Sequence, residues 1–318
     1  MKKSVIVLII IHISMIINAQ DAKLTVVDSL SNEPISYASA SFIETNSGTY
    51  TNEKGVLNID STHNSVLISH VGYYSRKLGR PFKNGAVKLR PQTYFLNEII
   101  VKPGKKKTEE TGYISFRSHL IINGFSGDEI AVYFPDRFDD IKFLKELKIC
   151  FDVFKPIKKF MGIDFVSVFK INLYSKKANS SEPDTSLLIK ELVFTSDKIK
   201  PTTRIDISNY NIRFPEDGIF VSIEWVGIEA EKTKELITDY KGRTEPFVST
   251  TFEKTDAIVF KRNKFSDNNW SLVDKNNELS INTSGNPSMG YIIDETTTFK
   301  YLSEFNDLKL IQYKINED

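Results

Sequence analysis

Cysteine and histidine are scarce in this chain of 318 residues, which holds one cysteine and four histidines. Cys150 has no second cysteine for an intramolecular disulfide, and no histidine lies near it in sequence. A packed thiol is therefore favoured over a catalytic one. The sequence has no His-Glu-x-x-His or Cys-x-x-Cys motif and no glycine-rich phosphate loop. It predicts no metal site and no bound cofactor.

An excess of charge of one sign is also missing. The chain has 42 basic and 41 acidic residues, so its formal net charge is +1. A balance this close to zero implies no polyanionic partner, and we expect no binding to nucleic acid. The sequence shows no internal repeat or low-complexity block, and its length is sufficient for two globular domains.

Long apolar runs are confined to the N-terminus. Lys2 and Lys3 precede an apolar run at residues 5–17, and the small residue Ala19 follows it. This order is typical of a secretory signal peptide, so we expect export to remove residues 1–19. No later run is long enough to cross a bilayer as a helix, and we expect no transmembrane segment in the mature chain. We expect the mature protein in the periplasm, at the outer membrane or outside the cell.

Residues 20–102 have the pattern of a small antiparallel β-sandwich, with short alternating strands separated by turn residues. Ala38, Ala40 and Phe42 alternate with Tyr37, Ser39, Ser41 and Ile43, which is the period of a pleated strand. The run 52–55 predicts a turn in which Gly55 takes a positive φ. A further strand is expected at 96–101.

These segments resemble the carboxypeptidase-regulatory-like domain of exported Gram-negative envelope proteins. The resemblance rests on Val26-Val27-Asp28, Asn32-Glu33-Pro34, Thr51-Asn52-Glu53-Lys54-Gly55-Val56-Leu57, Val71-Gly72-Tyr73 and Leu96-Asn97-Glu98-Ile99-Ile100-Val101. It implies an immunoglobulin-like or prealbumin-like sandwich that serves as a scaffold. The zinc motif of a peptidase is absent from the chain, so the resemblance does not imply peptidase activity.

Beyond a solvated linker at 103–112, residues 113–318 also have the pattern of strands. We expect strands at 165–174, 205–208, 220–226, 257–261, 279–282, 291–294 and 308–315, and short helices at 139–147 and 230–236. Parts of this region resemble the C-terminal sandwich that accompanies the regulatory-like domain. The expected fold is all-β, with a small sandwich followed by a larger, jelly-roll-like one.

Candidate functional residues are few. Glu224 beside Trp225 is the pair that most merits comparison with a glycosidase carboxylate, and Trp225, Glu224 and Trp270 together form a possible ligand face. Residues 124–127 lack the spacing of a nucleophile elbow and predict a turn. A packed or solvent-facing His70 is favoured over a ligand role.

Three functions remain open on the sequence. The first is an exported, non-catalytic binding or adhesion module whose partner is a glycan or another envelope protein. The second is a structural or assembly accessory of the outer envelope. The third is a hydrolase with an unrecognised carboxylate site. Exposed aromatic rings on one face would indicate sugar binding, whereas clustered carboxylates in a cleft would indicate hydrolysis.

Overall fold

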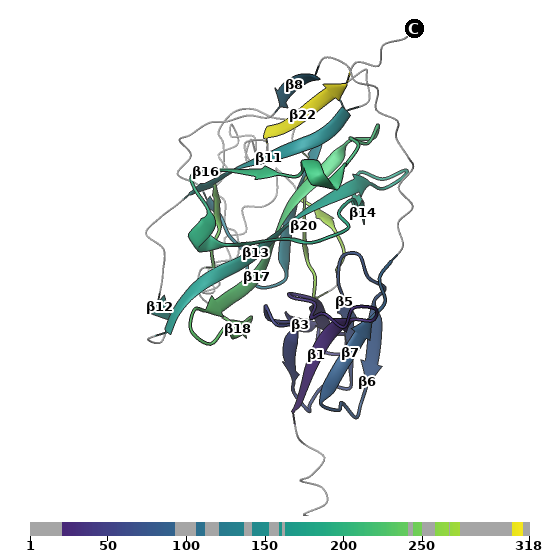
Figure 1. Cartoon of the computed structure of the whole chain (residues 1–318), viewed down its shortest axis with the longest axis vertical. Coiled ribbons are helices and arrows are strands. Elements are labelled where there is room, and N and C mark those ends of the chain that lie inside the picture. The colour runs from purple at the N-terminus through teal and green to yellow at the C-terminus, as the bar shows by residue number, and fades with distance from the viewer. Residues whose placement is uncertain are drawn as a thin grey trace, which may run out of the picture. The chain divides into compact units, whose positions relative to one another are not determined.

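The structure is a computed structural model, and it describes residues 21–92, 106–111, 121–136, 142–152, 159–160, 163–240, 244–249, 258–266, 268–273 and 307–313. The chain divides between Gln92 and Thr93 into two compact units. Both units consist of strands, and the only helices in the described ranges are two short 3₁₀ turns, η1 (Ser196–Lys198) and η2 (Ser208–Tyr210) (Figure 1). The predicted all-β fold class is confirmed.

The first unit is a sandwich of two small sheets. Its strands are β1 (Ala22–Asp28), β2 (Ser39–Phe42), β3 (Ser47–Tyr50), β4 (Val56–Ile59), β5 (Ser65–Ser69), β6 (Arg76–Gly79) and β7 (Gly85–Leu89). One sheet has the order β4-β1-β7 and the other β3-β2-β5-β6. Alternate residues of β1, β2, β4, β5 and β7 fill one shared apolar core, which includes Val26, Ala40, Ile59, Ile68 and Leu89. The alternation predicted for β2 is therefore confirmed.

The predicted turn at 52–55 is also confirmed. Gly55 has a φ of +71°, its N–H donates to the Asn52 carbonyl at 2.9 Å, and Asn52 Oδ1 accepts from the N–H groups of Lys54 and Val56. The Gly55 carbonyl accepts from Val26 N–H at 2.8 Å, so the turn is also fastened to β1.

The second unit contains the remaining described strands. They are β8 (Lys106–Thr111), β9 (Ile121–Ile122), β10 (Asp128–Phe134), β11 (Lys142–Asp152), β12 (Lys159–Phe160), β13 (Ile163–Lys176), β14 (Pro183–Ser186), β15 (Leu192–Thr195), β16 (Thr202–Asp206), β17 (Ile219–Ala230), β18 (Leu236–Ile237), β19 (Phe247–Ser249), β20 (Val259–Asn263), β21 (Ser271–Leu272) and β22 (Asp307–Tyr313). The strands predicted at 165–174, 220–226, 257–261 and 308–315 correspond to β13, β17, β20 and β22. The strand predicted at 205–208 overlaps β16 only at Ile205 and Asp206, because η2 begins at Ser208.

Two sheets form this unit. The larger has the order β12-β13-β17-β10-β20-β21, with β14 and β15 also paired to β13 and β18 to β17. The smaller has the order β8-β22-β11-β19-β9, with β16 also paired to β11. Phe151 of β11 packs edge-on against Phe169 of β13, with ring centroids 5.7 Å apart, so apolar side chains join the two sheets. The central strands β13 and β17 are buried on both faces, which makes their polar residues part of the interior.

Both predicted helices are wrong. Residues 142–147 belong to β11, where a bulge at Lys145 places Leu144 and Leu147 opposite Leu310 and Leu308 of β22. These partners are two positions apart, so Leu144 and Leu147 lie on one face although three positions separate them. That spacing imitates a helical period. Ala230 ends β17, Leu236 begins β18, and residues 231–235 form the turn between them, in which Lys234 has a φ of +58°.

The predicted linker at 103–112 is corrected in part, because its residues 106–111 form β8 and pair with β22. The charged run has no apolar side to bury, but the backbone of a sheet-edge strand needs only one partner, and β22 provides it. Residues 1–20, 96–101, 279–282 and 291–294, to which a signal peptide and three strands were assigned, lie outside the described residues.

Candidate functional site

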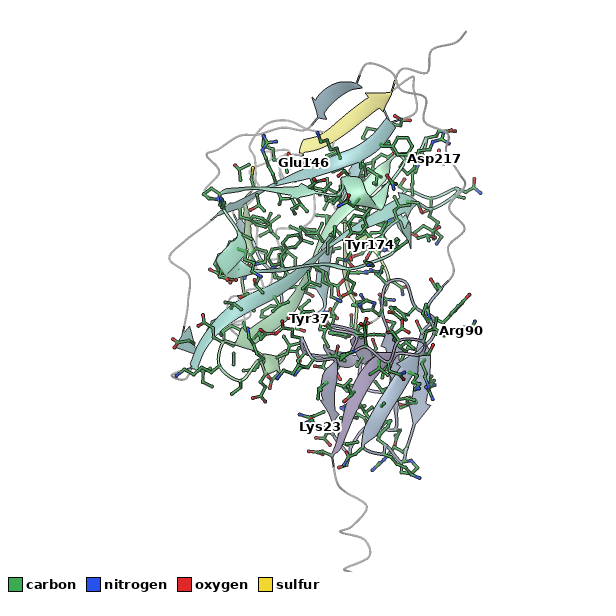
Figure 2. All side chains as sticks on the ribbon, viewed as in Figure 1. Lys23, Tyr37, Arg90, Glu146, Tyr174 and Asp217 are labelled. Carbon is green, nitrogen blue, oxygen red and sulfur yellow. The ribbon has the colours of Figure 1, made fainter. Side chains whose placement is uncertain are left out.

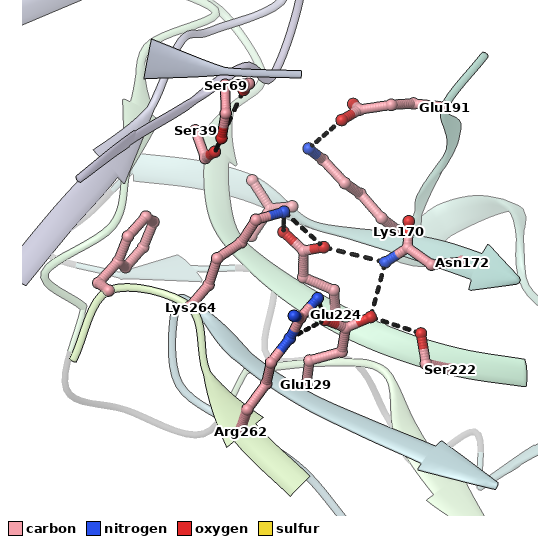
Figure 3. Close-up of polar contacts among 12 residues, drawn as sticks. Ser39, Ser69, Glu129, Lys170, Asn172, Glu191, Ser222, Glu224, Arg262 and Lys264 are labelled. Atoms are coloured by element: carbon pink, nitrogen blue, oxygen red, sulfur yellow. Dashed lines mark hydrogen bonds and ion pairs between the residues drawn. The ribbon is translucent and has the colours of Figure 1, made fainter. Parts of the chain in front are cut away.

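Two buried glutamates face each other in the larger sheet of the second unit. Glu129 of β10 and Glu224 of β17 are opposite each other in an antiparallel pair, so their side chains share one face. Both side chains are fully buried. Figure 3 shows them at the centre of a network of polar contacts.

The carboxylate of Glu129 accepts hydrogen bonds on both oxygens. Oε1 accepts from Asn172 Nδ2 at 2.8 Å, Tyr174 OH at 2.9 Å and Ser222 Oγ at 2.5 Å. Oε2 accepts from Nε and Nη2 of Arg262 at 2.8 and 2.6 Å. Five donors therefore surround this carboxylate, which compensates for its removal from water.

Glu224 shares one donor with Glu129 and has a cation of its own. Its Oε2 accepts from Asn172 Nδ2 at 2.9 Å, so one amide group bridges the two carboxylates. Lys264 Nζ lies 3.2 and 3.3 Å from Oε1 and Oε2. We name the seven residues of this network the carboxylate cluster: Glu129, Asn172, Tyr174, Ser222, Glu224, Arg262 and Lys264.

Strand alternation assembles the carboxylate cluster. Asn172 and Tyr174 are two positions apart on β13, as are Ser222 and Glu224 on β17. Cross-strand pairing then places Glu129 opposite both Glu224 and Arg262, because β10 lies between β17 and β20. Polar residues at alternate positions indicate a solvated face in many antiparallel sheets, but here that face is buried.

A third ion pair continues the same face. Lys170, also on β13, is opposite Glu224, and its Nζ lies 2.7 Å from Glu191 Oε1. Their side chains are only 1% and 6% exposed. With this pair, three carboxylates are matched by three cations, so the buried face carries no net charge.

Burial and the two carboxylates change the acidity of neighbouring groups. Burial raises the pKa of the Tyr174 hydroxyl well above its usual value, and the charge of Glu129 raises it further. Tyr174 therefore remains a hydrogen-bond donor at any physiological pH. Burial alone would lower the pKa of the Arg262 guanidinium, but the attraction and hydrogen bond of Glu129, together with the interactions with Tyr174 and Glu224, outweigh it, and the pKa is raised. Figure 2 shows Tyr174 in the interior of this unit.

Aromatic rings cover one side of the carboxylate cluster. Arg262 lies over the ring of half-buried Trp270, 4.1 Å from its centroid, and Trp270 is edge-on to Tyr174. Phe220, Phe260 and Ala131 continue this face as an apolar group with Tyr174. The aromatic end and the charged end therefore belong to one continuous buried layer.

The three residues predicted as one ligand face do not form one. Trp225 is opposite Phe169 and faces the apolar layer between the two sheets, whereas Glu224 and Trp270 belong to the other face. Trp225 is 1% exposed, and its Nε1 donates to the Pro246 carbonyl at 3.2 Å. Neighbouring residues in a strand point to opposite faces. Glu224 and Trp225 are adjacent in sequence and therefore lie on opposite faces of the sheet.

The arrangement is suited to holding strands together. A carboxylate that acts as a nucleophile or general base needs a free lone pair and room for the reacting atom. Glu129 and Glu224 instead use their oxygens to tie β10, β13, β17 and β20 through charged and amide donors. The carboxylate cluster therefore stabilises the pairing of these four strands.

Other predicted features have simpler positions. Residues 124–127 form a turn, in which Gly127 N–H donates to the Trp225 carbonyl and Asp128 N–H to the Phe125 carbonyl. Cys150 is buried in β11, and His70 Nδ1 lies 2.7 Å from the Val71 carbonyl. Within the described ranges, no group of three or more His, Cys, Asp or Glu residues could hold a metal ion. None of the helices described is long and apolar enough to span a bilayer.

Glu129, Asn172 and Arg262 were missed from the sequence. The available signal was the alternation of Lys170, Asn172 and Tyr174 on a strand whose other face is apolar. That pattern marks a polar face, but only the pairing of strands distant in sequence shows that the face is buried and which charges meet on it.

The chain matches no protein-family model, no curated protein and no solved structure. The resemblance to the carboxypeptidase-regulatory-like domain stays a prediction that rests on the residues alone.

Proposed function

We propose that this chain is an exported, non-catalytic protein of a Gram-negative envelope that acts by binding. In this proposal the first unit is a regulatory-like sandwich that serves as a scaffold, and the second is a rigid sandwich. The partner is a glycan or another envelope component, and no cofactor takes part.

The observation that carries the proposal is the state of the Glu129–Glu224 pair. A hydrolase of the glycosidase type needs two neighbouring carboxylates, and these two are fully buried and paired with Arg262 and Lys264. A buried pair with matched cations supports a structural role in the sheet. The hydrolase remains the competing candidate, because a glycosidase uses two neighbouring carboxylates. The two glutamates are close enough to accept hydrogen bonds from one amide group.

Binding and turnover of defined probes separate these candidates. The mature chain would be incubated with peptidoglycan sacculi, polygalacturonate and dextran, and retention and release of reducing ends would be measured together. We expect retention on at least one of the anionic probes or sacculi without release of reducing ends. Release that disappears in Glu224→Gln, in a variant that keeps its melting temperature, would establish the hydrolase instead. If the chain is not retained on any probe and releases no reducing ends, the result contradicts both candidates.

Export is the second part of the proposal. Because Ala19 follows a short apolar run, the mature protein should begin at Gln20 or Asp21. Mass spectrometry of the protein recovered from cell-envelope fractions would show this N-terminus. Recovery of a chain that retains Met1 from the cytoplasm would exclude this part of the proposal.

A further inference from the structure

Charge is divided unevenly within the first unit. All of its acidic residues lie between positions 21 and 60, and none lies between positions 61 and 92. The second stretch carries six basic residues, which we name the basic edge: Arg76, Lys77, Arg80, Lys83, Lys88 and Arg90. The net charge of +1 for the whole chain conceals this local excess.

The residues of the basic edge lie in or next to two strands, each of which is the outermost strand of its sheet. β6 ends the order β3-β2-β5-β6, and β7 ends the order β4-β1-β7. The two strands lie side by side on one side of the unit (Figure 1), where Arg76 Nη1 donates to the Lys88 carbonyl at 3.0 Å. A bridge between Tyr73 and Pro91 continues the contact beyond the strand ends. The six bases therefore lie on β6, on β7 and in the segments next to them, at one border of the sandwich.

These cations are available to a ligand. All six side chains are exposed, and none forms an ion pair with any other residue in the described part of the chain. Asp28 precedes Ser29, whose N–H donates to the Leu89 carbonyl at the end of β7, and its carboxylate accepts from the N–H groups of Leu30 and Ser31 and from Tyr73 OH. Glu44 accepts from Ser65 Oγ, and this hydrogen bond and the charge of Lys77 lower the pKa of Glu44. Arg90 lies over the ring of Tyr74 at 4.2 Å and points outward from the unit (Figure 2).

We propose that the basic edge binds a linear acidic polysaccharide, an inference that deepens the proposed binding function and rests on it. Carboxylate or sulfate groups repeated along an extended chain can meet several exposed cations spread along one border, whereas a single small anion would use only two or three of them. The guanidinium groups of Arg76 and Arg90 suit planar carboxylates, and exposed Tyr74 adds an aromatic surface beside them.

Basic residues on edge strands have a second explanation, because charge of either sign prevents two sheet edges from pairing. The two explanations differ in whether the sign of the side-chain charge matters. Replacing Lys by Glu keeps a charge on the edge but reverses the attraction for an anion. If the basic edge binds an anion, a charge reversal should therefore weaken binding without leaving a neutral edge.

The test compares two pairs of charge reversals with equal net charge. Lys77→Glu/Lys88→Glu alters the basic edge, and Lys54→Glu/Lys200→Glu alters two exposed lysines elsewhere. Binding of the mature chain to polygalacturonate would be measured at low and high salt, with dextran as the neutral control. We expect the edge pair to weaken binding about tenfold or more and the control pair less than about twofold. Wild-type binding should fall as salt increases.

Each other outcome contradicts the inference. Equal losses in both variants would show that only net charge matters, and unchanged binding in the edge variant would place the ligand elsewhere while the proposed binding function stands. Double-stranded DNA bound as tightly, with the same loss in the edge variant, would make this a nucleic-acid surface. If the wild type does not bind polygalacturonate but is still retained on sacculi, an acidic polysaccharide is refuted as the ligand and the proposed binding function stands.

Discussion

Gly55 is the residue at which backbone conformation and packing both restrict the side chain. Its φ is +71°, and a Cβ at this position would lie 2.7 Å from the Val26 carbonyl oxygen and 3.1 Å from Ile35 N. The sequence predicted the positive φ from the turn, but the close approach of β1 is visible only in the structure. Two independent restraints therefore require glycine here.

We expect Gly55→Val to destabilise the first unit by at least about 1–3 kcal/mol, because a β-branched side chain is strained at positive φ. Gly79→Val is the matched control, since Gly79 lies in β6 and a Cβ there would meet nothing within 4 Å. Urea unfolding of both variants measures the difference. Equal stability of the two variants would contradict the turn geometry.

Asp28 gives the first unit a pH dependence with a definite sign. The N–H groups of Leu30 and Ser31, together with Tyr73 OH, lower the pKa of Asp28 from its ordinary value of 3.8, although partial burial opposes this. A lowered pKa in the folded state stabilises the protein above the unfolded value, and this contribution is lost as the pH falls through the folded value.

We therefore expect Asp28→Asn to lower the melting temperature at pH 7 and to have little effect well below pH 3.8. Asparagine keeps an acceptor oxygen for Leu30 and Ser31, so the variant removes mainly the charge. Thermal unfolding between pH 2 and pH 7 measures the effect. A difference that stays constant over this range would show that the charge of Asp28 contributes nothing.

At the scale of elements, the carboxylate cluster joins four strands whose residues are far apart in sequence. Glu129 and Arg262 are separated by 133 positions, and Asn172 and Glu224 by 52. Ion pairs that are buried this completely differ from surface pairs, because removing one partner leaves the other charge without water. The strength of the cluster can therefore be measured by removing one member.

Arg262→Met should destabilise the second unit by about 3–5 kcal/mol, because Glu129 would remain buried without its cation. Lys177→Met is the matched control: it removes the exposed pair with Glu182, whose side chains are 55% and 39% exposed, and should cost less than about 1 kcal/mol. Adding Glu129→Gln to Arg262→Met should restore part of the loss. Equal destabilisation by the two single variants, measured by urea unfolding, would show that the cluster is not a structural tie.

For the whole molecule, the division between Gln92 and Thr93 predicts two independent folding units. The first has a core of its own that includes Val26, Ile59 and Leu89. Within the second, β8 pairs with β22 over six residue positions, although the sequence pattern assigned this segment to a linker. The boundary of the second unit must therefore precede β8.

Two fragments test this boundary. Residues 93–318 should melt cooperatively, whereas residues 113–318, which lack β8, should melt at least about 5 °C lower because an edge of the smaller sheet is lost. Residues 20–92 should show their own transition and serve as the control for the first unit. Identical melting of the two longer fragments would mean that β8 adds no stability.

The sequence by itself determined the features that depend on a few neighbouring residues. The alternation in β2, the positive φ of Gly55 and most central strands follow from propensity and from side-chain period, which are local properties. Tertiary structure decided the rest. The bulge in β11 made Leu144 and Leu147 imitate a helix, and β8 became a strand because β22 lies beside it. The carboxylate cluster likewise exists because strands distant in sequence pair, since burial and charge pairing are properties of the assembled sheet and not of any one strand.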